Sequence, residues 1–391
     1  MPSGVIILTI HYVFRLTPAW PKLAPLSNNV MGSSLVHLQA SVFERFGDVK
    51  ISVIGSLAEQ QIQGFLKTLD IPDCKIMQLG KNPFANIDPD AIVFIFEAPA
   101  YLDEIAVLKI MDLLAQERKS VYHLQLENRR QLQIYALSGK SAQTFSAQDA
   151  EELPLNDVMP VDTLLDFHNL RESVRKKIIL KHIEKGVIIK NPDTISIDGD
   201  VIIDNGVVIE PGTVLTGHTR IGCSSRIGPN AVIDSCKVGS SCTIINSTLS
   251  LSILDNNVRV GPYAHIRPDC HLCDNTVIGS FVELKNAKID EGSFVTQLSY
   301  IGDSEVGKHV NIGCGVITAN FNGVSKHMTQ IEDNAFVGCN SVLVAPVSIG
   351  AGSIVSAGSA ITNDVPPYAL AIARSRQMNK EEWALDRARN W

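Results

Sequence analysis

The stretch "ISIDGDVIIDNGVVIEPGTVLTGHTRIGCSSRIGPNAVI", residues 195–233, has an aliphatic residue at every sixth position. The series is Ile197, Ile203, Ile209, Leu215, Ile221, Ile227 and Ile233. A period of six fits neither the turn of an α-helix nor the alternation of a hairpin strand. A chain that turns a corner every six residues can instead stack its aliphatic side chains inward, coil upon coil. The pattern therefore predicts a parallel β-helix.

The same ladder resumes towards the carboxyl end, with slips of one residue. It continues through Val260, Ile266, Leu272, Ile278, Leu284, Val295, Ile301, Val306 and Ile312, and then through Ile331, Val337, Leu343, Ile349, Val355 and Ile361. At roughly 18 residues for three sides, residues 190–367 predict about nine or ten coils, each adding ~4.8 Å. A break around 314–330 predicts a loop that leaves the coils, and Pro366-Pro367 predicts the end of the ladder.

Residues 1–160 have a different pattern, in which β-branched runs alternate with helical stretches. Strands are expected at 5–10, 49–55, 91–97 and 120–126, and a helix over 101–117, where Ile105, Leu108, Ile110 and Leu114 recur. This alternation predicts an α/β domain with a mostly parallel sheet. Residues 161–189 are charged and free of proline, which predicts a linking helix that ends at Gly186. Residues 368–391 form the carboxy-terminal tail or helix.

Composition excludes two classes of partner. The chain has 34 Lys plus Arg against 41 Asp plus Glu, a net charge of -7, and no basic run with interleaved aromatics, so nucleic acid is not an expected partner. No apolar run approaches the ~20 residues of a membrane helix. The apolar residues 1–16 lack a basic start and a small-residue cleavage site, which favours a buried strand over a signal peptide. We expect a cytoplasmic protein.

The eight cysteines form no disulfide framework. Cys270 and Cys273 make a single C-x-x-C with His271 between them, a pattern that raises the question of zinc. No second pair with suitable spacing completes a zinc site. Two cysteines of the coil wall, and no metal site, are the prediction.

Five stretches of residues 261–391 carry a resemblance to a known family. They are "GPYAHIRPD", "GSFVELKNAKI", "SYIGDSEVGKHVNIGCGVITANFNG", "FVGCNSVLVAPVSIG" and "ALAIARSRQMNKEEW". The segment resembles, without gaps, the carboxy-terminal half of the GlmU-type bifunctional enzyme, a glucosamine-1-phosphate acetyltransferase fused to an N-acetylglucosamine-1-phosphate uridylyltransferase. The resemblance implies a left-handed β-helix in a homotrimer, acetyl-CoA as cosubstrate bound between protomers, and an amino-sugar phosphate as the small-molecule partner.

The resemblance also implies binding residues. The sugar-phosphate contacts fall on Arg267, Lys285, Tyr300, Asn311, Asn320 and Lys326. Two lysines and an arginine suit a phosphate dianion, and amides and a phenol can orient hydroxyl groups. The acetyl-CoA contacts fall on Cys314, Phe321, Cys339, Ala357 and Arg374. Arg374 suits a CoA phosphate, although a tail arginine can equally pack at a trimer interface.

One catalytic position departs from the family. In "VTQLSY", residues 295–300, Gln297 stands where the resemblance implies the histidine that acts as general base on the sugar amine. An amide does not titrate near neutral pH, and losing a general base typically costs ~10²- to 10⁴-fold in rate. Glu283 remains where the family has a carboxylate near the reacting amine. His265 and His309 are alternative bases on nearby coils, or merely exposed histidines.

Three outcomes of this departure stay open. The first is an N-acyltransferase that is slow or differently tuned and uses Glu283 or water as the base. The second is a different acceptor, such as a nucleotide-linked sugar. The third is a non-catalytic homologue, a sugar-phosphate or CoA-binding or structural trimer.

The amino-terminal domain resembles the family only by position. The family has a glycine-rich nucleotide loop followed by a P-K motif, and here "LTIHYVFRL" (8–16) and "WPKL" (20–23) take these places. Arg15 and Lys22 are retained, but His11 and Val13 occupy glycine positions, where side chains obstruct a phosphate. Glu97 replaces the metal-binding aspartate. We expect a Rossmann-like, degenerate nucleotidyltransferase-like domain that has no uridylyltransferase activity, does not bind Mg²⁺, and helps assembly or binds another ligand.

Overall fold

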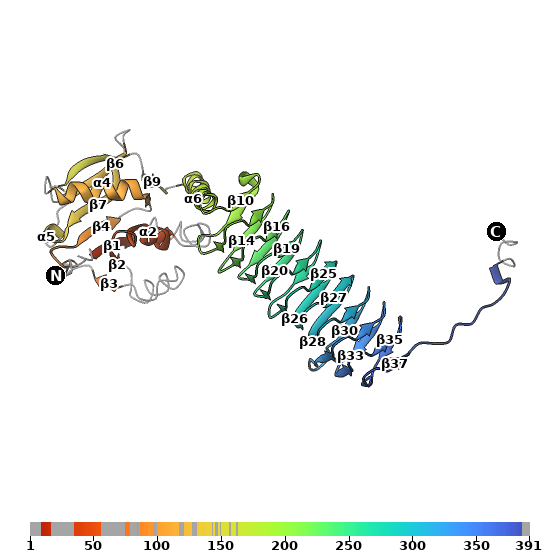
Figure 1. The fold of residues 1–391 in the computed structure, drawn as a ribbon. Coiled ribbons are helices and arrows are strands. Elements are labelled where there is room, and N and C mark those ends of the chain that lie inside the picture. Colours follow the sequence, from red (N-terminus) through yellow and green to blue (C-terminus); the bar gives the residue numbers. More distant parts are fainter. Residues whose placement is uncertain are drawn as a thin grey trace, which may run out of the picture. The chain divides into compact units, whose positions relative to one another are not determined.

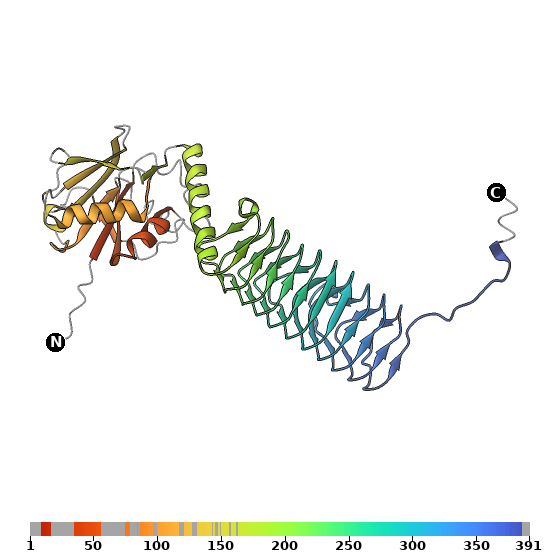
Figure 2. The same ribbon diagram turned by 45° about the horizontal axis from the view of Figure 1, so that its top comes forward.

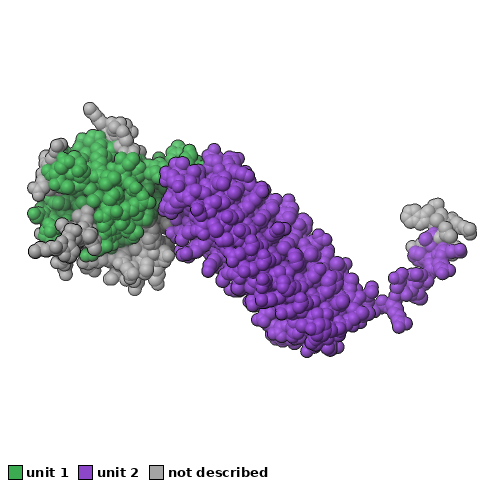
Figure 3. Space-filling view, viewed as in Figure 1, with its two compact units in different colours: residues 1–178 green, residues 179–391 purple. Residues whose placement is uncertain are grey.

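The computed structural model describes residues 9–16, 35–55, 75–78, 84, 87–96, 100–116, 121–126, 131–142, 144, 148, 150–155, 158–161 and 163–384. The chain divides into two compact units, Met1–Ile178 and Ile179–Trp391, which are coloured separately in Figure 3. Among the described residues, no helix is both long enough and apolar enough to cross a membrane.

The first unit is built on a mixed seven-stranded sheet. Its strand order is β3 (Lys75–Gln78), β2 (Asp48–Gly55), β1 (Thr9–Leu16), β4 (Ile92–Phe96), β7 (Gln131–Ser138), β6 (Val121–Leu126) and β8 (Glu151–Leu155). The first four strands are parallel, and β7 is antiparallel to both of its neighbours. β5 (Ala100–Leu102) and β9 (Val158–Pro160) form a separate antiparallel pair. The predicted α/β class is confirmed.

The described residues of this unit include the helices α2 (Leu35–Phe43), α4 (Glu104–Ala115) and α5 (Gly139–Ala142). α4 begins after Asp103, whose carboxylate accepts hydrogen bonds from the Ile105 and Ala106 amides at 3.1 Å, an N-cap. Its buried residues are Ala106, Val107, Ile110 and Leu114. Ile105 and Leu108, which share the helical spacing of Ile110 and Leu114, are instead 62% and 53% exposed. Starting the helix at this cap turns Ala106 and Val107 towards the sheet instead.

The stretch in which the resemblance placed a nucleotide loop is a central strand. β1 runs from Thr9 to Leu16 and pairs with both β2 and β4, while residues 5–8 of the strand expected at 5–10 lie outside the described residues. Tyr12 is fully buried, with its ring edge-on to Phe43 at 5.5 Å and to Phe96 at 4.9 Å between centroids. With β-branched and aromatic residues and no glycine, this stretch has the composition of a strand rather than a loop. Lys22 and Glu97 lie outside the described residues.

A long helix, α6 (Leu164–Glu184), lies within the 161–189 segment. It begins with a capping box, in which the Asp166 carboxylate accepts from the Thr163 amide at 2.9 Å and the Asp166 amide donates to Thr163 Oγ1 at 3.2 Å. It is followed by Gly186, whose φ of 88° supplies the left-handed residue of a helix C-cap. The boundary between the two units falls inside α6.

The second unit is a parallel β-helix whose short strands stack in rows (Figures 1 and 2). One row is an eleven-stranded sheet of β10 (Ile188–Ile189), β13 (Val208–Ile209), β16 (Arg226–Ile227), β19 (Thr243–Ile244), β22 (Arg259–Val260), β25 (Val277–Ser280), β27 (Phe294–Gln297), β29 (Asn311–Ile312), β32 (Phe336–Val337), β35 (Ile354–Val355) and β37 (Leu370–Ala371). The other two sides form one seventeen-stranded sheet, because some strands continue around the corner between them.

That sheet contains β11 (Ser196–Ile197), β12 (Ile202–Ile203), β14 (Val214–Thr216), β15 (Arg220–Ile221), β17 (Val232–Asp234), β18 (Lys237–Val238), β20 (Thr248–Ser250), β21 (Ile253–Leu254), β23 (His265–Ile266), β24 (His271–Leu272), β26 (Glu283–Ile289), β28 (Tyr300–Val306), β30 (Ile317–Ala319), β31 (Thr329–Ile331), β33 (Val342–Val344), β34 (Val347–Ile349) and β36 (Ala360–Ile361). A 3₁₀ turn, Pro192–Thr194, precedes β11.

The aliphatic ladder forms the core of this unit, as predicted, and each of its residues is buried. The structure also fills the gap that the sequence left between Ile233 and Val260. Buried Val238, Ile244, Leu249 and Leu254 continue the ladder there, after steps of five, six, five and five residues. The shorter steps concealed the repeat, although the side chains still stack inward.

Two predicted boundaries were wrong. β30 (Ile317–Ala319) still pairs with β33, so the excursion loop is limited to residues 320–328 rather than beginning at 314. β37 pairs with β35 beyond Pro366-Pro367, because the prolines occupy a corner and not a hydrogen-bonded strand position. Since β10 and β37 both lie outside 190–367, nine of the eleven strands remain inside it, as predicted.

Buried hydroxyl groups join successive coils below the aliphatic ladder. Ser225 Oγ donates to the Gly239 carbonyl at 3.0 Å and accepts from the Cys242 amide at 3.0 Å. Ser293 makes the equivalent pair with the Gly307 carbonyl at 2.6 Å and the Val310 amide at 2.9 Å. Each hydroxyl thus satisfies one backbone acceptor and one donor that would otherwise be unpaired at a corner.

The C-x-x-C pair is divided between two environments. Cys270 is buried in the wall, as expected, whereas Cys273 is only partly buried. Both cysteines belong to the coil wall, and the Cys273 side chain is turned outward because it follows the inward-facing Leu272.

One buried histidine makes stability depend on pH. His182, in the last turn of α6, is 5% exposed, and its Nδ1 has no hydrogen-bond partner among the described residues. Burial, with smaller contributions from the charges of Lys185 and Lys181, lowers the pKa of His182 from 6.5 to about 4. The fold therefore stabilises the neutral imidazole. This contribution is complete above pH 6.5 and is lost as the pH falls towards 4.

We expect the free energy of unfolding to decrease by about 2 to 3 kcal/mol between pH 7 and pH 4.5 because of this residue. Urea denaturation at both pH values measures the change. In His182→Leu the decrease should be smaller by this amount, while His168→Gln, an exposed histidine on the same helix, should keep the parent profile. An unchanged decrease in His182→Leu would contradict the assignment.

Candidate functional site

Three cationic side chains converge on one side of the β-helix. Arg267 follows β23, Lys285 lies one coil further in β26, and Lys326 comes from the excursion loop. The contact and charge of Lys326 lower the pKa of Lys285, and Arg267 adds to this effect. We call Arg267, Lys285 and Lys326 the cationic cluster. Because like charges are held together here, an anion bound between them would be stabilised.

A buried aspartate supports this cluster. Asp303 is 6% exposed and accepts hydrogen bonds from Asn286 Nδ2, at 2.7 Å, and from Asn320 Nδ2. Burial alone would raise the pKa of Asp303, but the two amide hydrogen bonds and the charges of Lys326 and Lys285 outweigh it and lower the pKa. The ionised carboxylate thus orients the predicted Asn320 and partly balances the lysines.

Sequence reasoning missed Asp303 and Asn286, although a signal was present. Asp269, Asn286, Asp303 and Asn320 recur every 17 residues. The first three have left-handed backbones, with φ of 65°, 44° and 46°. Asn and Asp adopt this conformation more readily than other residues with side chains. An Asx residue at each turn of one corner therefore marks a polar row beside the sugar-phosphate positions.

Glu283 and Tyr300 lie side by side on β26 and β28. Glu283 Oε1 accepts from Arg267 Nη1 at 3.0 Å, with both side chains 39% exposed. The Tyr300 ring lies over Gly302, where an added Cβ would stand 2.5 Å from the tyrosine hydroxyl oxygen. The absence of a side chain at position 302 therefore leaves room for the phenol, and Gly302 is the ladder partner of Lys285.

The predicted acetyl-CoA positions form a second row that begins at Gln297. The Gln297, Cys314 and Cys339 carbonyls accept from the Gly315, Asn340 and Gly358 amides at 3.2, 2.7 and 2.8 Å. This repeated pattern places Gln297, Cys314, Cys339 and Ala357 directly above one another on successive coils. We call Cys314, Cys339 and Ala357 the small-residue row.

Gln297, directly below the small-residue row, and Tyr300, the neighbour of Glu283, lie on either side of one corner of a coil. Gln297 ends β27 and Tyr300 begins β28, with Leu298 between them at a φ of 53°. The Gln297 side chain is exposed, and its carbonyl also accepts from Ser299 Oγ at 3.0 Å. Gln297 and Tyr300 therefore flank the same corner, and the small-residue row continues from Gln297.

The excursion loop has a defined shape. Asn322 Oδ1 accepts from the Val324 and Ser325 amides at 2.9 Å, and Asn322 Nδ2 lies 2.9 Å from His327 Nε2. Exposed Phe321 forms an antiparallel bridge with Lys326, so the loop presents both residues together. This places a predicted CoA contact beside a predicted sugar-phosphate contact.

The remaining predicted residues are less closely gathered. Asn311 lies in β29 between Phe294 and Phe336, and no hydrogen bond joins it to the cationic cluster within residues 163–384. Arg374 is exposed and follows Ala373, whose carbonyl accepts from the Ala360 amide at 3.1 Å. This bond places Arg374 beside Ala360, in the column of Tyr300, Ile317 and Val342, and not on the small-residue row.

The two candidate substitute bases differ in position. His265 pairs in register with Glu283 from the preceding coil. His309 lies at another corner, where its imidazole covers Gly292. Of these two histidines, only His265 belongs to the column that contains Glu283 and Tyr300.

Comparison with protein families defines the class of this fold. Residues 252–286 match the "Bacterial transferase hexapeptide (six repeats)" model, and residues 328–363 match the "Hexapeptide repeat of succinyl-transferase" model. The second unit is thus a left-handed β-helix that contains hexapeptide repeats.

Curated relatives are similar to this chain over a longer stretch of sequence. Proteins named "Bifunctional protein GlmU" are 43% identical over 227 residues in Alkaliphilus metalliredigens and 48% identical over 235 residues in Thermoanaerobacter pseudethanolicus. These matches cover 58% and 60% of this chain, and 50% and 51% of the relatives. The GlmU-type resemblance is thereby confirmed, and the chain spans about half the length of the curated relatives it matches.

Two solved structures are similar at a lower level. They are Francisella novicida UDP-N-acetylglucosamine acyltransferase, at 16% identity over 48% of this chain and 67% of that chain, and LpxA from Acinetobacter baumannii, at 19% identity over 49% and 78%. The TM-score is 0.32 for both.

Lys285→Ala should weaken binding of glucosamine-1-phosphate about 10- to 100-fold, because a hydrogen bond to a charged group contributes ~1.5 to 3 kcal/mol. Isothermal titration calorimetry at low salt measures this. The matched control is Lys308→Ala, a lysine that pairs with Glu291 at 3.3 Å away from the cluster. Equal weakening in both variants would show a general charge effect instead of a phosphate site.

Gly302→Ala should displace the Tyr300 ring and weaken the same binding as much as Tyr300→Ala does. The backbone needs no left-handed conformation at position 302, so the far-ultraviolet circular dichroism should stay unchanged. A double-mutant cycle separates this effect from general damage. In a Tyr300→Ala background the Gly302→Ala change should have no further effect, and additive losses would contradict the proposed packing.

Proposed function

We propose that this chain is an N-acyltransferase that transfers the acetyl group of acetyl-CoA to the amine of an amino-sugar 1-phosphate, with glucosamine-1-phosphate as the acceptor to test first. The observation that carries the proposal is the position of Gln297, which begins the column of the small-residue row and lies across one corner from Tyr300 and its ladder partner Glu283. The GlmU-type relatives support acyl transfer as the reaction class.

The proposed roles follow from charge and position. The cationic cluster holds the sugar phosphate, while Tyr300 and the oriented amide of Asn320 contact sugar hydroxyls. Acetyl-CoA lies along the small-residue row, with Phe321 beside it and Arg374 towards its phosphates. In this arrangement the sugar amine and the thioester carbonyl meet beside Gln297.

The amine nitrogen then attacks the thioester carbonyl, the carbon–sulfur bond breaks, and CoA leaves as its thiol after taking up a proton. Gln297 cannot accept the proton from the amine, although its amide can donate a hydrogen bond. A sugar amine with a pKa near 8 is about one tenth neutral at pH 7, so an oriented acceptor needs no strong base to react slowly. Glu283 has Oε2 available for this proton, since Arg267 occupies Oε1. Water is the other candidate base.

We further propose that the chain assembles as a homotrimer and that its amino-terminal unit has no uridylyltransferase activity and binds no Mg²⁺. The β1 strand supports the absence of uridylyltransferase activity. It occupies the positions of the nucleotide loop, and it has parallel strands on both sides. A backbone paired on both sides has no free amides to surround a phosphate. We propose that this unit assists assembly or binds another ligand.

A second candidate function is a non-catalytic protein that binds a sugar phosphate or CoA, or a structural trimer. Two observations favour it. Position 297 holds a group that does not titrate, and the nearby Glu283 is already paired with Arg267. Binding would then survive without turnover.

Release of CoA from acetyl-CoA in the presence of glucosamine-1-phosphate tests the two functions. We expect slow turnover in the parent, loss of turnover in Glu283→Ala, and a rise of ~10²- to 10⁴-fold in Gln297→His, the range of a general base. Glu305→Ala, which removes an exposed carboxylate elsewhere on β28, is the matched control and should behave as the parent.

Different results identify the alternatives. A silent parent with an active Gln297→His would mean that the pocket is complete and only the base is missing. Silence in every variant, with retained binding of sugar phosphate, would favour the binding protein and contradict acyl transfer to this acceptor.

A further inference from the structure

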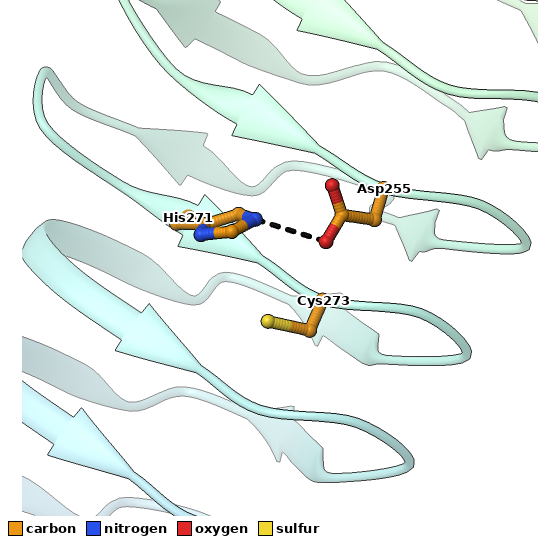
Figure 4. Close-up of side chains that lie close together, drawn as sticks. All are labelled: Asp255, His271 and Cys273. Atoms are coloured by element: carbon orange, nitrogen blue, oxygen red, sulfur yellow. Dashed lines mark hydrogen bonds and ion pairs between the residues drawn. The ribbon is translucent and has the colours of Figure 1, made fainter.

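Three side chains outside the acyl-transfer site bring together the donor atoms of a metal site. Asp255 follows β21, and His271 and Cys273 flank the inward-facing Leu272 one coil later. A carboxylate oxygen, an imidazole nitrogen and the thiol sulfur all lie within 4.8 Å of one another. Figure 4 shows the His271 ring directed at Asp255 and the Cys273 sulfur on the same side.

The backbone ladder holds these residues in place without any ligand. The Asp255 amide donates to the Leu272 carbonyl at 2.8 Å, and the Cys273 amide donates to the Ile289 carbonyl at 2.9 Å, so Asp255 and Cys273 take equivalent positions on successive coils. His271 pairs in register with Ile253. All three side chains thus project from a rigid, preorganised wall.

The donor set suits Zn²⁺. A thiolate, an imidazole and a carboxylate are its usual protein ligands, with bonds of about 2.0 to 2.3 Å in tetrahedral sites. Such bonds place the donor atoms roughly 3.3 to 3.8 Å apart. His271 Nε2 and Asp255 Oδ2 are 2.9 Å apart, so side-chain shifts of about 1 Å convert the present arrangement into a zinc geometry.

The neighbouring charges are compatible with a cation. Asp290, one coil beyond Cys273, contacts the Cys273 thiol and forms an ion pair with Lys288 at 3.2 Å. The Lys288 ammonium is thus paired with Asp290, and the Asp255 carboxylate can bind the metal. Asp290 then serves as an outer partner that orients the sulfur ligand.

The C-x-x-C motif is not the basis of this site. Cys270 is 3% exposed, and its sulfur lies 4.0 Å from the Pro268 carbonyl in the wall. The missing ligand is Asp255, which lies 16 residues before His271 and is brought to it only by the stacking of coils. Sequence spacing alone therefore predicted no metal here.

We propose that Asp255, His271 and Cys273 form a structural Zn²⁺ site with one position left for water. The ion would join two successive coils immediately before the coil that contains Glu283 and Lys285. It takes no part in the proposed acyl transfer.

The test uses the full-length chain after removal of metals with a chelator. Competition with a chromophoric chelator should give one Zn²⁺ per chain, and Co²⁺ should produce the intense visible bands of a tetrahedral site with a thiolate charge-transfer band. Cys273→Ser should abolish the charge-transfer band. Cys273→Ser and His271→Gln should each weaken Zn²⁺ binding by at least the ~100-fold that loss of an outer partner can cost.

Two matched variants control for the loss of a thiol. Cys223→Ser changes a partly exposed thiol that contacts Ser240 at 3.3 Å in another part of the β-helix, and Cys270→Ala removes the other half of the C-x-x-C. Both should bind Zn²⁺ as the parent does, and circular dichroism should show that each variant is folded. The proposal is overturned if the metal-free parent binds no Zn²⁺ in the competition assay, or if Cys273→Ser and His271→Gln bind Zn²⁺ as the parent does. It is also overturned if Cys223→Ser loses as much Zn²⁺ affinity as Cys273→Ser.

Discussion

The stacking of aliphatic side chains inside the coils is the constraint on which the rest of this structure depends. Each coil is one strand spacing, ~4.8 Å, from the next, and the buried ladder determines which residues of each coil face inward. Every outward residue is then placed by its position within a coil. Residues that are far apart in the chain form rows, such as Gln297 with Cys314 and Cys339, and a functional site arises where two rows meet.

The electrostatics of the site follow from the same stacking. Arg267 and Lys285 lie on consecutive coils and Lys326 reaches them from the excursion loop, so three positive charges stand together above the buried Asp303. Repulsion between these charges raises the free energy of the ligand-free chain, and a bound dianion would offset it. Gln297 has an amide that does not titrate near neutral pH, whereas the cationic cluster carries three positive charges, so binding and turnover have to be measured separately.

The proposed zinc site applies the same geometry to different chemistry. Asp255 and Cys273 are equivalent positions on neighbouring coils, as Arg267 and Lys285 are. In the zinc site the stacked positions carry donor atoms for a metal cation, whereas in the cationic cluster they carry positive charges for an anion. Since ligands held by a rigid ladder lose little entropy on binding, a short row of three side chains is sufficient for a site.

The sequence by itself determined the repeat, the direction of the wall residues, the α/β class of the first unit and the β-helix of the second, because these depend on local periodicity and contiguous motifs. Resemblance also led to the prediction of Arg267, Lys285, Asn320 and Gln297 as site residues. Only the tertiary structure decided the support of Asn320 by Asp303, the Glu283–Arg267 ion pair, the true length of the excursion loop and the approach of Asp255 to Cys273. Those features depend on which coil lies above which, and steps of five residues between Ile233 and Val260 shift that register in a way that a strict period of six does not reveal.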